Sequence, residues 1–276
     1  MALIDLDGIR LEMQHLTPVT RSENSDVSLD KPTIVFLHEG LGSIAMWRDW
    51  PQTVCDTTGL SGLVYSRRGY GQSDTIPDVR ALPNPTRPRE GRLPANYLHM
   101  QAWEVLPALL AQLGIQRPVL LGHSDGASIA LLYAARFPTA ACVAMAPHVI
   151  VEDISIAAIA QARDAFKLGT LRRSLARYHT DVDCAFWQWN DVWLSEAFRS
   201  FDIRQECALI TCPMLAIQGW DDTYGSMAQI DFIRNIYSHP ALQKLEHCGH
   251  SPHRDQPALT THLIQEFLAT SLSHLN

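Results

Sequence analysis

The sequence predicts an α/β fold: a mostly parallel, eight-stranded sheet flanked by helices, with one inserted helical segment. Short apolar runs recur along the chain, each bounded by glycine, proline or polar residues, and the middle runs are continuous rather than alternating. Continuous runs are typical of strands buried on both faces of a parallel sheet. Stretches with helical periodicity separate the runs, as expected for strands joined by right-handed helical crossovers.

Eight apolar runs predict the strands in chain order. The first two, "LIDL" and "IRLEMQHL", flank Asp7-Gly8 and predict an antiparallel hairpin at one edge of the sheet. Six further runs predict the remaining strands, at residues 33–38, 62–66, 118–122, 141–146, 214–219 and 242–247. Apolar residues spaced i, i+3 and i+4 predict helices over residues 97–113, 125–137 and 258–272.

The predicted organisation is a core of residues 1–148 and 207–276, with residues 149–206 inserted as a helical cap. The inserted segment has helical patterning throughout and no good strand. It contains "AFWQWNDVWL", with three tryptophans close together. These tryptophans either pack the insertion onto the core or form walls of an apolar acyl pocket, and the two roles are compatible.

Composition and charge narrow the class of protein. Of the 276 residues, 46% are hydrophobic and 18% are charged, a balance typical of globular chains with a buried core. A net charge of −7 and a pI near 5.9 argue against a nucleic-acid or anionic-membrane binder, because those proteins usually present a basic face. No secretory signal pattern opens the sequence, so we expect a cytoplasmic protein that acts on a small molecule. A homodimer is compatible with the sequence.

A second irregular stretch, at residues 75–94, reads "TIPDVRALPNPTRPREGRLP". Its five prolines exclude regular structure and predict a surface loop. The four arginines between Arg80 and Arg92 are either solvated or receive an anionic group of a substrate, such as a phosphate or a carboxylate.

The stretch "PVLLGHSDGASIA" places Ser124 between a predicted strand and a predicted helix, in the pattern Gly122-His123-Ser124-Asp125-Gly126. The pattern alone is weak, and its context carries the argument. A serine on a sharp strand-to-helix turn leaves no room for side chains two residues to either side, which explains the glycines. The turn raises Oγ above the sheet edge and aims the first N–H groups of the helix at the same point. We therefore predict that Ser124 is a nucleophile and that the Asp125 N–H is an oxyanion donor.

A serine hydroxyl needs a base, and the base needs an orienting acid. In "LEHCGHSPHRDQP", His250 follows the last predicted strand, whereas His247 falls at its end and His253 begins the final helix. In "MLAIQGWDDTYG", Asp221 and Asp222 follow the preceding strand, and either could accept from the imidazole Nδ1–H. The glycine-rich "HEGLGS" after residues 33–38 predicts the second oxyanion donor, with Gly40 preferred and Leu41 as the alternative.

With these motifs assembled, nearly the whole chain resembles the α/β-hydrolase superfamily, specifically its cap-bearing serine hydrolases. The landmarks are "HEGLGS", "YSRRGYGQS", "GHSDG", "GWDD" and "CGHSPHRDQP", in that order. The family's spacing from Gly219 implies that the acid is Asp222 rather than Asp221. A serine at the elbow implies an esterase, thioesterase, C–C hydrolase, peptidase or haloperoxidase rather than a dehalogenase or epoxide hydrolase. Glu39 departs from the His-Gly of the family's oxyanion loop, so its carboxylate either contacts substrate or joins a hydrogen-bond network.

The sequence therefore predicts a hydrolase that cleaves carboxylic esters through an acyl enzyme, with Ser124, His250 and Asp222 as catalytic residues. We expect no metal or organic cofactor, because protein groups supply the nucleophile, the proton carrier and the charge stabiliser. The alternatives are a thioesterase or C–C bond hydrolase on the same machinery, a cofactor-free haloperoxidase, or a non-catalytic ligand-binding protein. Further pocket side chains are expected at Glu39, Leu41, His123, Trp187, Trp189 and Trp193.

Overall fold

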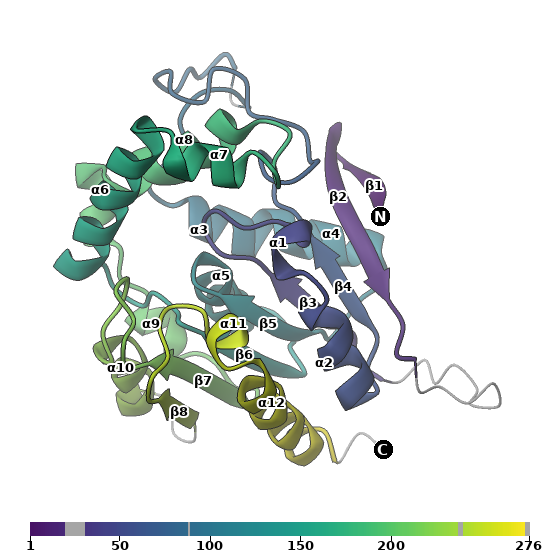
Figure 1. Ribbon diagram of the computed structural model, residues 1–276. Helices are drawn as coiled ribbons and strands as arrows, with labels where there is room; N and C mark the ends of the chain where they lie inside the picture. Colours follow the sequence, from purple (N-terminus) through teal and green to yellow (C-terminus); the bar gives the residue numbers. More distant parts are fainter. Residues whose placement is uncertain (20–30, 88, 237–239, 274–276) are drawn as a thin grey trace.

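One eight-stranded sheet runs through the centre of the computed structural model, which describes residues 1–19, 31–87, 89–236 and 240–273 (Figure 1). The strand order is β1-β2-β4-β3-β5-β6-β7-β8, with β1 and β2 antiparallel to their neighbours and all other pairs parallel. The strands are β1 (Ala2–Leu6), β2 (Ile9–Leu16), β3 (Ile34–Leu37), β4 (Gly62–Tyr65), β5 (Val119–His123), β6 (Ala141–Met145), β7 (Met214–Gly219) and β8 (Ala241–Leu245). The predicted fold class and the edge hairpin are confirmed.

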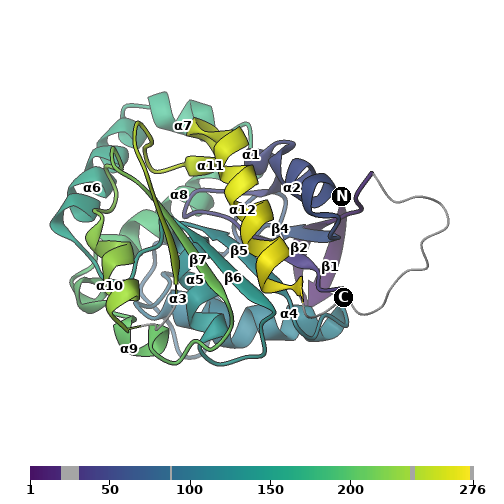
Figure 2. The ribbon, with the colours of Figure 1, turned by 90° about the horizontal axis from the view of Figure 1, so that it is seen from below.

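Helices cover both faces of the sheet, which explains why the middle strands, β3 to β7, are buried at every position. Helices α2 (Trp50–Thr58) and α12 (Pro257–Ser271) lie on one face, and α4 (Leu106–Gln112), α5 (Asp125–Ala134) and α10 (Ala228–Ile236) lie on the other (Figure 2). Because successive residues of a strand point to opposite faces, Phe36 packs with the first group and Leu37 with the second. The two faces thus form two separate hydrophobic clusters.

The predicted helix at residues 97–113 forms as three consecutive segments. Helix α3 (Tyr97–Met100) leads into the π-helical turn η1 (Gln101–Val105), which leads into α4. Pro107 lacks an N–H and its ring crowds the preceding turn, so a wide turn just before it accommodates the proline without ending the helix. The predicted helix at 125–137 is shorter than expected, since α5 ends at Ala134.

The segment at residues 149–206 is helical, as its pattern predicts, and forms a layer above the sheet in Figure 1. An isolated antiparallel bridge between Ile150 and Asp202 joins its two ends to each other. Inside the layer, the rings of Phe166 and Phe186 stack with their centroids 3.8 Å apart. Its elements are α6 (Asp153–Lys167), α7 (Thr170–Leu175), α8 (Val182–Trp193), the 3-10 turn η2 (Glu196–Ser200) and α9 (Arg204–Cys207), which extends one residue past the expected boundary.

The remaining short helices are α1 (Ile44–Trp47), after β3, and α11 (Pro252–Asp255), before α12. Residues 75–94 form no helix or strand in their described part, as predicted, and residue 88 lies outside the described residues. Within the described ranges, none of the helices combines the length and the apolar character that crossing a bilayer would require.

Candidate active site

Ser124 lies on a strained turn between β5 and α5. Its backbone has φ 55° and ψ −120°, a region that side-chain-bearing residues rarely adopt. A Cβ added at Gly122 would collide with the carbonyl oxygen of Gly126, and one added at Gly126 would collide with the carbonyl oxygen of Leu37. Both obstacles are backbone atoms that cannot move aside. The two glycines are therefore what allows the chain to turn this sharply beneath the serine.

Ser124, His250 and Asp222 form one hydrogen-bonded row. His250 Nε2 lies 2.9 Å from Ser124 Oγ, and His250 Nδ1 lies 2.8 Å from Asp222 Oδ2. Because a carboxylate only accepts, Nδ1 carries the proton and Nε2 is left to accept from the serine hydroxyl. Asp222 Oδ1 and Oδ2 also accept hydrogen bonds, from the Tyr224 N–H and the Gln218 amide, both at 2.7 Å.

The acid of this row is held in its ionised form. Burial raises the pKa of Asp222, but the hydrogen bond and charge of His250 and the Tyr224 N–H outweigh burial and bring that pKa below its ordinary value. An ionised carboxylate at Nδ1 can stabilise an imidazolium at His250.

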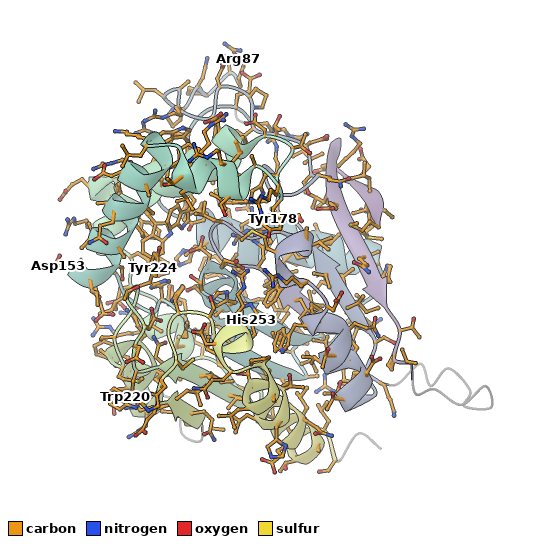
Figure 3. All side chains as sticks on the ribbon, in the orientation of Figure 1. Arg87, Asp153, Tyr178, Trp220, Tyr224 and His253 are labelled. Carbon is orange, nitrogen blue, oxygen red and sulfur yellow. The ribbon has the colours of Figure 1, made fainter. Side chains whose placement is uncertain are left out.

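The competing residues do not reach Ser124. His247 and Asp221 are exposed. His253 is buried beside Trp47 and Trp50, with ring centroids 4.8 and 5.2 Å apart, on α11 (Figure 3). His250 is distinguished from His247 and His253 by its contact with Ser124, and Asp222 is distinguished from Asp221 by its contact with His250.

The predicted oxyanion donors come from two parts of the chain, the start of α5 and the loop after β3. Asp125 is the first residue of α5, and the first N–H groups of a helix have no partner within it. Its side chain is fully buried and accepts from Tyr97 Oη at 2.5 Å, which fixes the start of the helix. Gly40 and Leu41 follow β3, and the Leu41 carbonyl accepts from His179 Nε2 at 3.0 Å. The same bond attaches the helical layer to the loop after β3.

Glu39 points into a network behind the row. Its carboxylate lies 3.5 Å from His123 Nδ1 and 3.2 Å from Arg254 Nη2. His123 Nε2 in turn donates to the backbone carbonyl of His250 at 2.7 Å. Burial raises the pKa of Glu39, but the neighbouring His123 and Arg254 bring it well below its ordinary value. Of the two roles predicted for Glu39, the structure favours the network.

Two of the three predicted tryptophans reach this site. Trp189 and Trp193 are four residues apart on α8 and so share one face of the helix. The Trp189 indole lies so close to Gly40 that a Cβ there would overlap its ring. Trp193 Nε1 donates to Tyr97 Oη at 3.0 Å and to Asp125 Oδ1 at 3.2 Å.

Trp187 is not brought to the site. Its ring packs edge-on against Phe186, and the Arg80 guanidinium stacks over it at 3.8 Å. The helical period turns residue 187 away from the face that carries residues 189 and 193. The structure therefore places Trp187 apart from the face that carries Trp189 and Trp193.

Sequence reasoning missed three side chains around the row. The His148 ring lies 5.7 Å from the His250 ring, and burial together with the His250 charge lowers the pKa of His148 to about 3. The Tyr224 ring lies 4.8 Å from the His250 ring, below α6 in Figure 3. His179, from the loop before α8, accepts from the Gly71 N–H at 3.0 Å. Only His148 carried a usable signal, because it follows the carboxyl end of a buried parallel strand.

Among the described residues, no group of three or more His, Cys, Asp or Glu side chains is arranged to hold a metal ion. The chemistry that this arrangement can support is proton transfer between the Ser124 hydroxyl and the His250 imidazole, beside the first N–H groups of α5, which can stabilise negative charge.

A polar row of this kind at the carboxyl edge of a mostly parallel sheet is the arrangement shared by hydrolases of the α/β class. The chain belongs to that family: the sequence model of the alpha/beta hydrolase fold family matches residues 32–189. The chain is also 26% identical over 293 aligned residues to the sn-1-specific diacylglycerol lipase ABHD11 of Mus musculus, covering 94% of this chain and 88% of that protein.

Solved structures share the fold at low sequence identity. The enol-lactonase from Burkholderia xenovorans LB400 superposes with a TM-score of 0.70 at 18% identity, over 97% of this chain and 99% of that one. A thermophilic esterase from Thermogutta terrifontis, solved with malate bound, gives a TM-score of 0.68 at 16% identity, over 98% and 97% of the two chains. The family and these relatives agree with the predicted hydrolase.

Proposed function

We propose that the protein hydrolyses carboxylic esters through an acyl enzyme on Ser124. The observation that carries the proposal is the continuous row from Asp222 through His250 to Ser124, with separations of 2.8 and 2.9 Å. These are the distances at which a base can take a proton from a nucleophile while an acid fixes its tautomer.

In the proposed reaction, Ser124 Oγ attacks the ester carbonyl carbon as its proton passes to His250 Nε2. The carbonyl oxygen becomes negative and is stabilised by the N–H groups of Asp125 and Gly40. His250 then gives the proton to the leaving alcohol, and the serine remains acylated. Water, activated by the same imidazole, releases the acid and restores Ser124. Every group in this scheme belongs to the chain, so the proposal includes no cofactor.

The relatives favour an ester over other bonds. The three proteins above are named as a diacylglycerol lipase, an enol-lactonase and an esterase. Diacylglycerols and lactones are both carboxylic esters. We therefore place the ester hydrolase ahead of the thioesterase and C–C hydrolase alternatives.

We further propose that residues 149–206 act as a cap over the core of residues 1–148 and 207–276. The bond from His179 to Leu41 and the contact of Trp189 with Gly40 support this role, since both join the helical layer to the oxyanion loop. In this arrangement the cap limits water access and Trp189 borders the space open to the substrate.

The test compares p-nitrophenyl esters of increasing acyl length with acyl-CoA thioesters of the same lengths. We expect turnover of the oxygen esters by the wild type, none above background by Ser124→Ala, and wild-type rates for Ser200→Ala, a matched change at an exposed serine. A higher kcat/KM for the thioesters would move the reaction to that class. Absence of turnover with both panels would contradict the proposed hydrolase.

A further inference from the structure

A cavity of about 540 Å³ lies beside the predicted site, where the β1–β2 hairpin, residues 89–94 and the helix from α3 to α4 meet. Its described lining includes neither Ser124 nor His250. Its walls are largely apolar, with Leu11, Ile76 and Met100 among them. The cavity is therefore a second space, next to the one that the proposed reaction uses.

Some residues that line this cavity carry buried polar atoms without a partner. Within the described part of the chain, Arg67 Nε, Arg67 Nη1 and Arg92 Nε are buried and make no hydrogen bond. Both arginines line the cavity, together with Gln188, whose amide nitrogen Nε2 is also buried without a partner. Leaving a buried donor unpaired costs free energy, so such a cluster indicates a bound acceptor.

Arg67 makes the strongest case, because its charge is buried and only partly balanced. Its side chain is 4% exposed, and a guanidinium remains protonated in a protein. Its Nη2 donates to the Glu39 carbonyl at 2.9 Å and lies 3.8 Å from Asp125 Oδ2, and the guanidinium carbon lies 5.1 Å from the centre of the Tyr70 ring. That carboxylate already accepts from Tyr97 and Trp193. The other two nitrogens of Arg67 remain for an anion.

The charges around the cavity are consistent with an anionic occupant. Arg67, Arg68, Arg89 and Arg92 line it, against the acids Asp7, Glu90 and Glu104. Asp7 and Glu104 are exposed to solvent, Glu90 is paired with Arg87 at 2.7 Å, and Arg92 Nη2 lies 3.7 Å from Asp191. The buried end of the cavity therefore carries the Arg67 charge, while the acids lie toward the solvent.

We propose that this cavity binds the carboxylate or phosphate of a small, otherwise apolar molecule, with Arg67 at its inner end and Arg92 nearer the mouth. The anion is either a tail of the ester substrate or a separate small molecule. The first source rests on the proposed function, whereas the second does not. In both cases the occupant touches a residue that also holds the oxyanion loop through the Glu39 carbonyl.

Binding is tested in the Ser124→Ala protein, so that the result does not depend on catalysis. Hexanoate, its neutral isostere hexanamide, and inorganic phosphate are titrated by calorimetry. We expect hexanoate or phosphate to bind, and hexanamide to bind at least about tenfold more weakly, since it lacks the charge that Arg67 pairs with. Equal affinity for hexanoate and hexanamide, with no binding of phosphate, would overturn the proposal.

Variants locate the bound anion. Arg67→Met and Arg92→Met are expected to weaken anion binding about tenfold each. Arg117→Met is the matched control, because Arg117 is exposed and does not belong to the described lining of the cavity. If Arg67→Met fails to fold, Arg92→Met carries the test alone. Folded Arg92→Met protein that binds as tightly as the control would overturn the assignment.

Kinetics of the catalytically intact enzyme then separate the two sources. p-Nitrophenyl hexanoate is compared with the mono-p-nitrophenyl ester of adipic acid, which carries a terminal carboxylate on a chain of the same length. A fall of about tenfold in kcat/KM for the anionic ester alone in Arg92→Met identifies a substrate tail. Unchanged kinetics with weakened binding identify a separate anion. If the wild type turns over neither ester but still binds the anion, the proposed function is contradicted and the proposed anion site is not.

Discussion

The buried imidazole of His148 makes a quantitative prediction about stability in acid. Burial and the His250 charge lower the pKa of His148 from 6.5 to about 3 in the folded protein. The folded state therefore keeps this ring neutral where the unfolded chain would protonate it. The neutral His148 ring therefore contributes fully to the free energy of unfolding above the unfolded pKa of 6.5. This contribution falls as the pH drops below that value and is lost near pH 3.

The size of the effect follows from these two pKa values. At pH 5 the unfolded imidazole lies about 1.5 pH units below its pKa, and each unit corresponds to about 1.4 kcal/mol. The folded ring still takes up almost no proton at that pH, so His148 alone costs about 2 kcal/mol of unfolding free energy between pH 7 and pH 5. His38, His179 and His253, whose pKa values are also lowered chiefly by burial, add losses of the same sign.

The assay is urea unfolding followed by tryptophan fluorescence at pH 7 and at pH 5, for the wild type and for His148→Phe. We expect the loss of unfolding free energy on acidification to be about 2 kcal/mol smaller in the variant. The comparison is between two pH values within one protein, so a change in packing caused by the phenylalanine cancels. His262→Gln, at an exposed position, serves as the control. An equal loss in wild type and His148→Phe would refute the reasoning.

Three further predictions concern the row and the parts that hold it. Asp222→Asn should lower kcat by about 10⁴-fold through loss of the correct imidazole tautomer, while Asp221→Asn should stay near wild type; the reverse order in steady-state assays would show that the acid is wrongly chosen. Gly40→Ala should lower kcat/KM, because its Cβ meets the Trp189 indole, and Trp189→Leu in the same chain should restore part of the loss; no recovery in the double variant would contradict this contact. His179→Leu should destabilise the protein by about 1–3 kcal/mol in urea unfolding, because one buried and one partly buried hydrogen bond are lost. An unchanged midpoint would argue against the role of these bonds in attaching the helical layer.

The sheet and the turn at Ser124 could be predicted from the sequence because both depend on short stretches of the chain. A strand covered on both faces must be apolar throughout, and the turn at Ser124 needs glycine on either side because backbone atoms of Gly126 and Leu37 occupy the space. His250 could be identified from its place after the last strand. Choosing Asp222 over Asp221 needed family spacing, since adjacent residues of a turn have the same local pattern.

The surroundings of the row could not be predicted because they depend on how distant segments dock. His179 reaches Leu41 across 138 positions, and Arg67 and Arg68 are adjacent arginines of which only Arg67 is fully buried. The separation of Trp187 from Trp189 is an exception, since helical periodicity alone places them on different faces of α8. The division of the predicted helix at residues 97–113 into α3, η1 and α4 could not be predicted either, because Pro107 is accommodated by a π turn rather than by a break in the helix.

The central claim is that Ser124 is a nucleophile activated by His250. Intact-mass spectrometry after exposure to a fluorophosphonate tests it without knowledge of the substrate. The account predicts one covalent adduct in the wild type, located on Ser124, absent in Ser124→Ala and strongly slowed in His250→Ala. A folded wild-type protein that stays unlabelled, or that carries the label on another residue, would contradict the account.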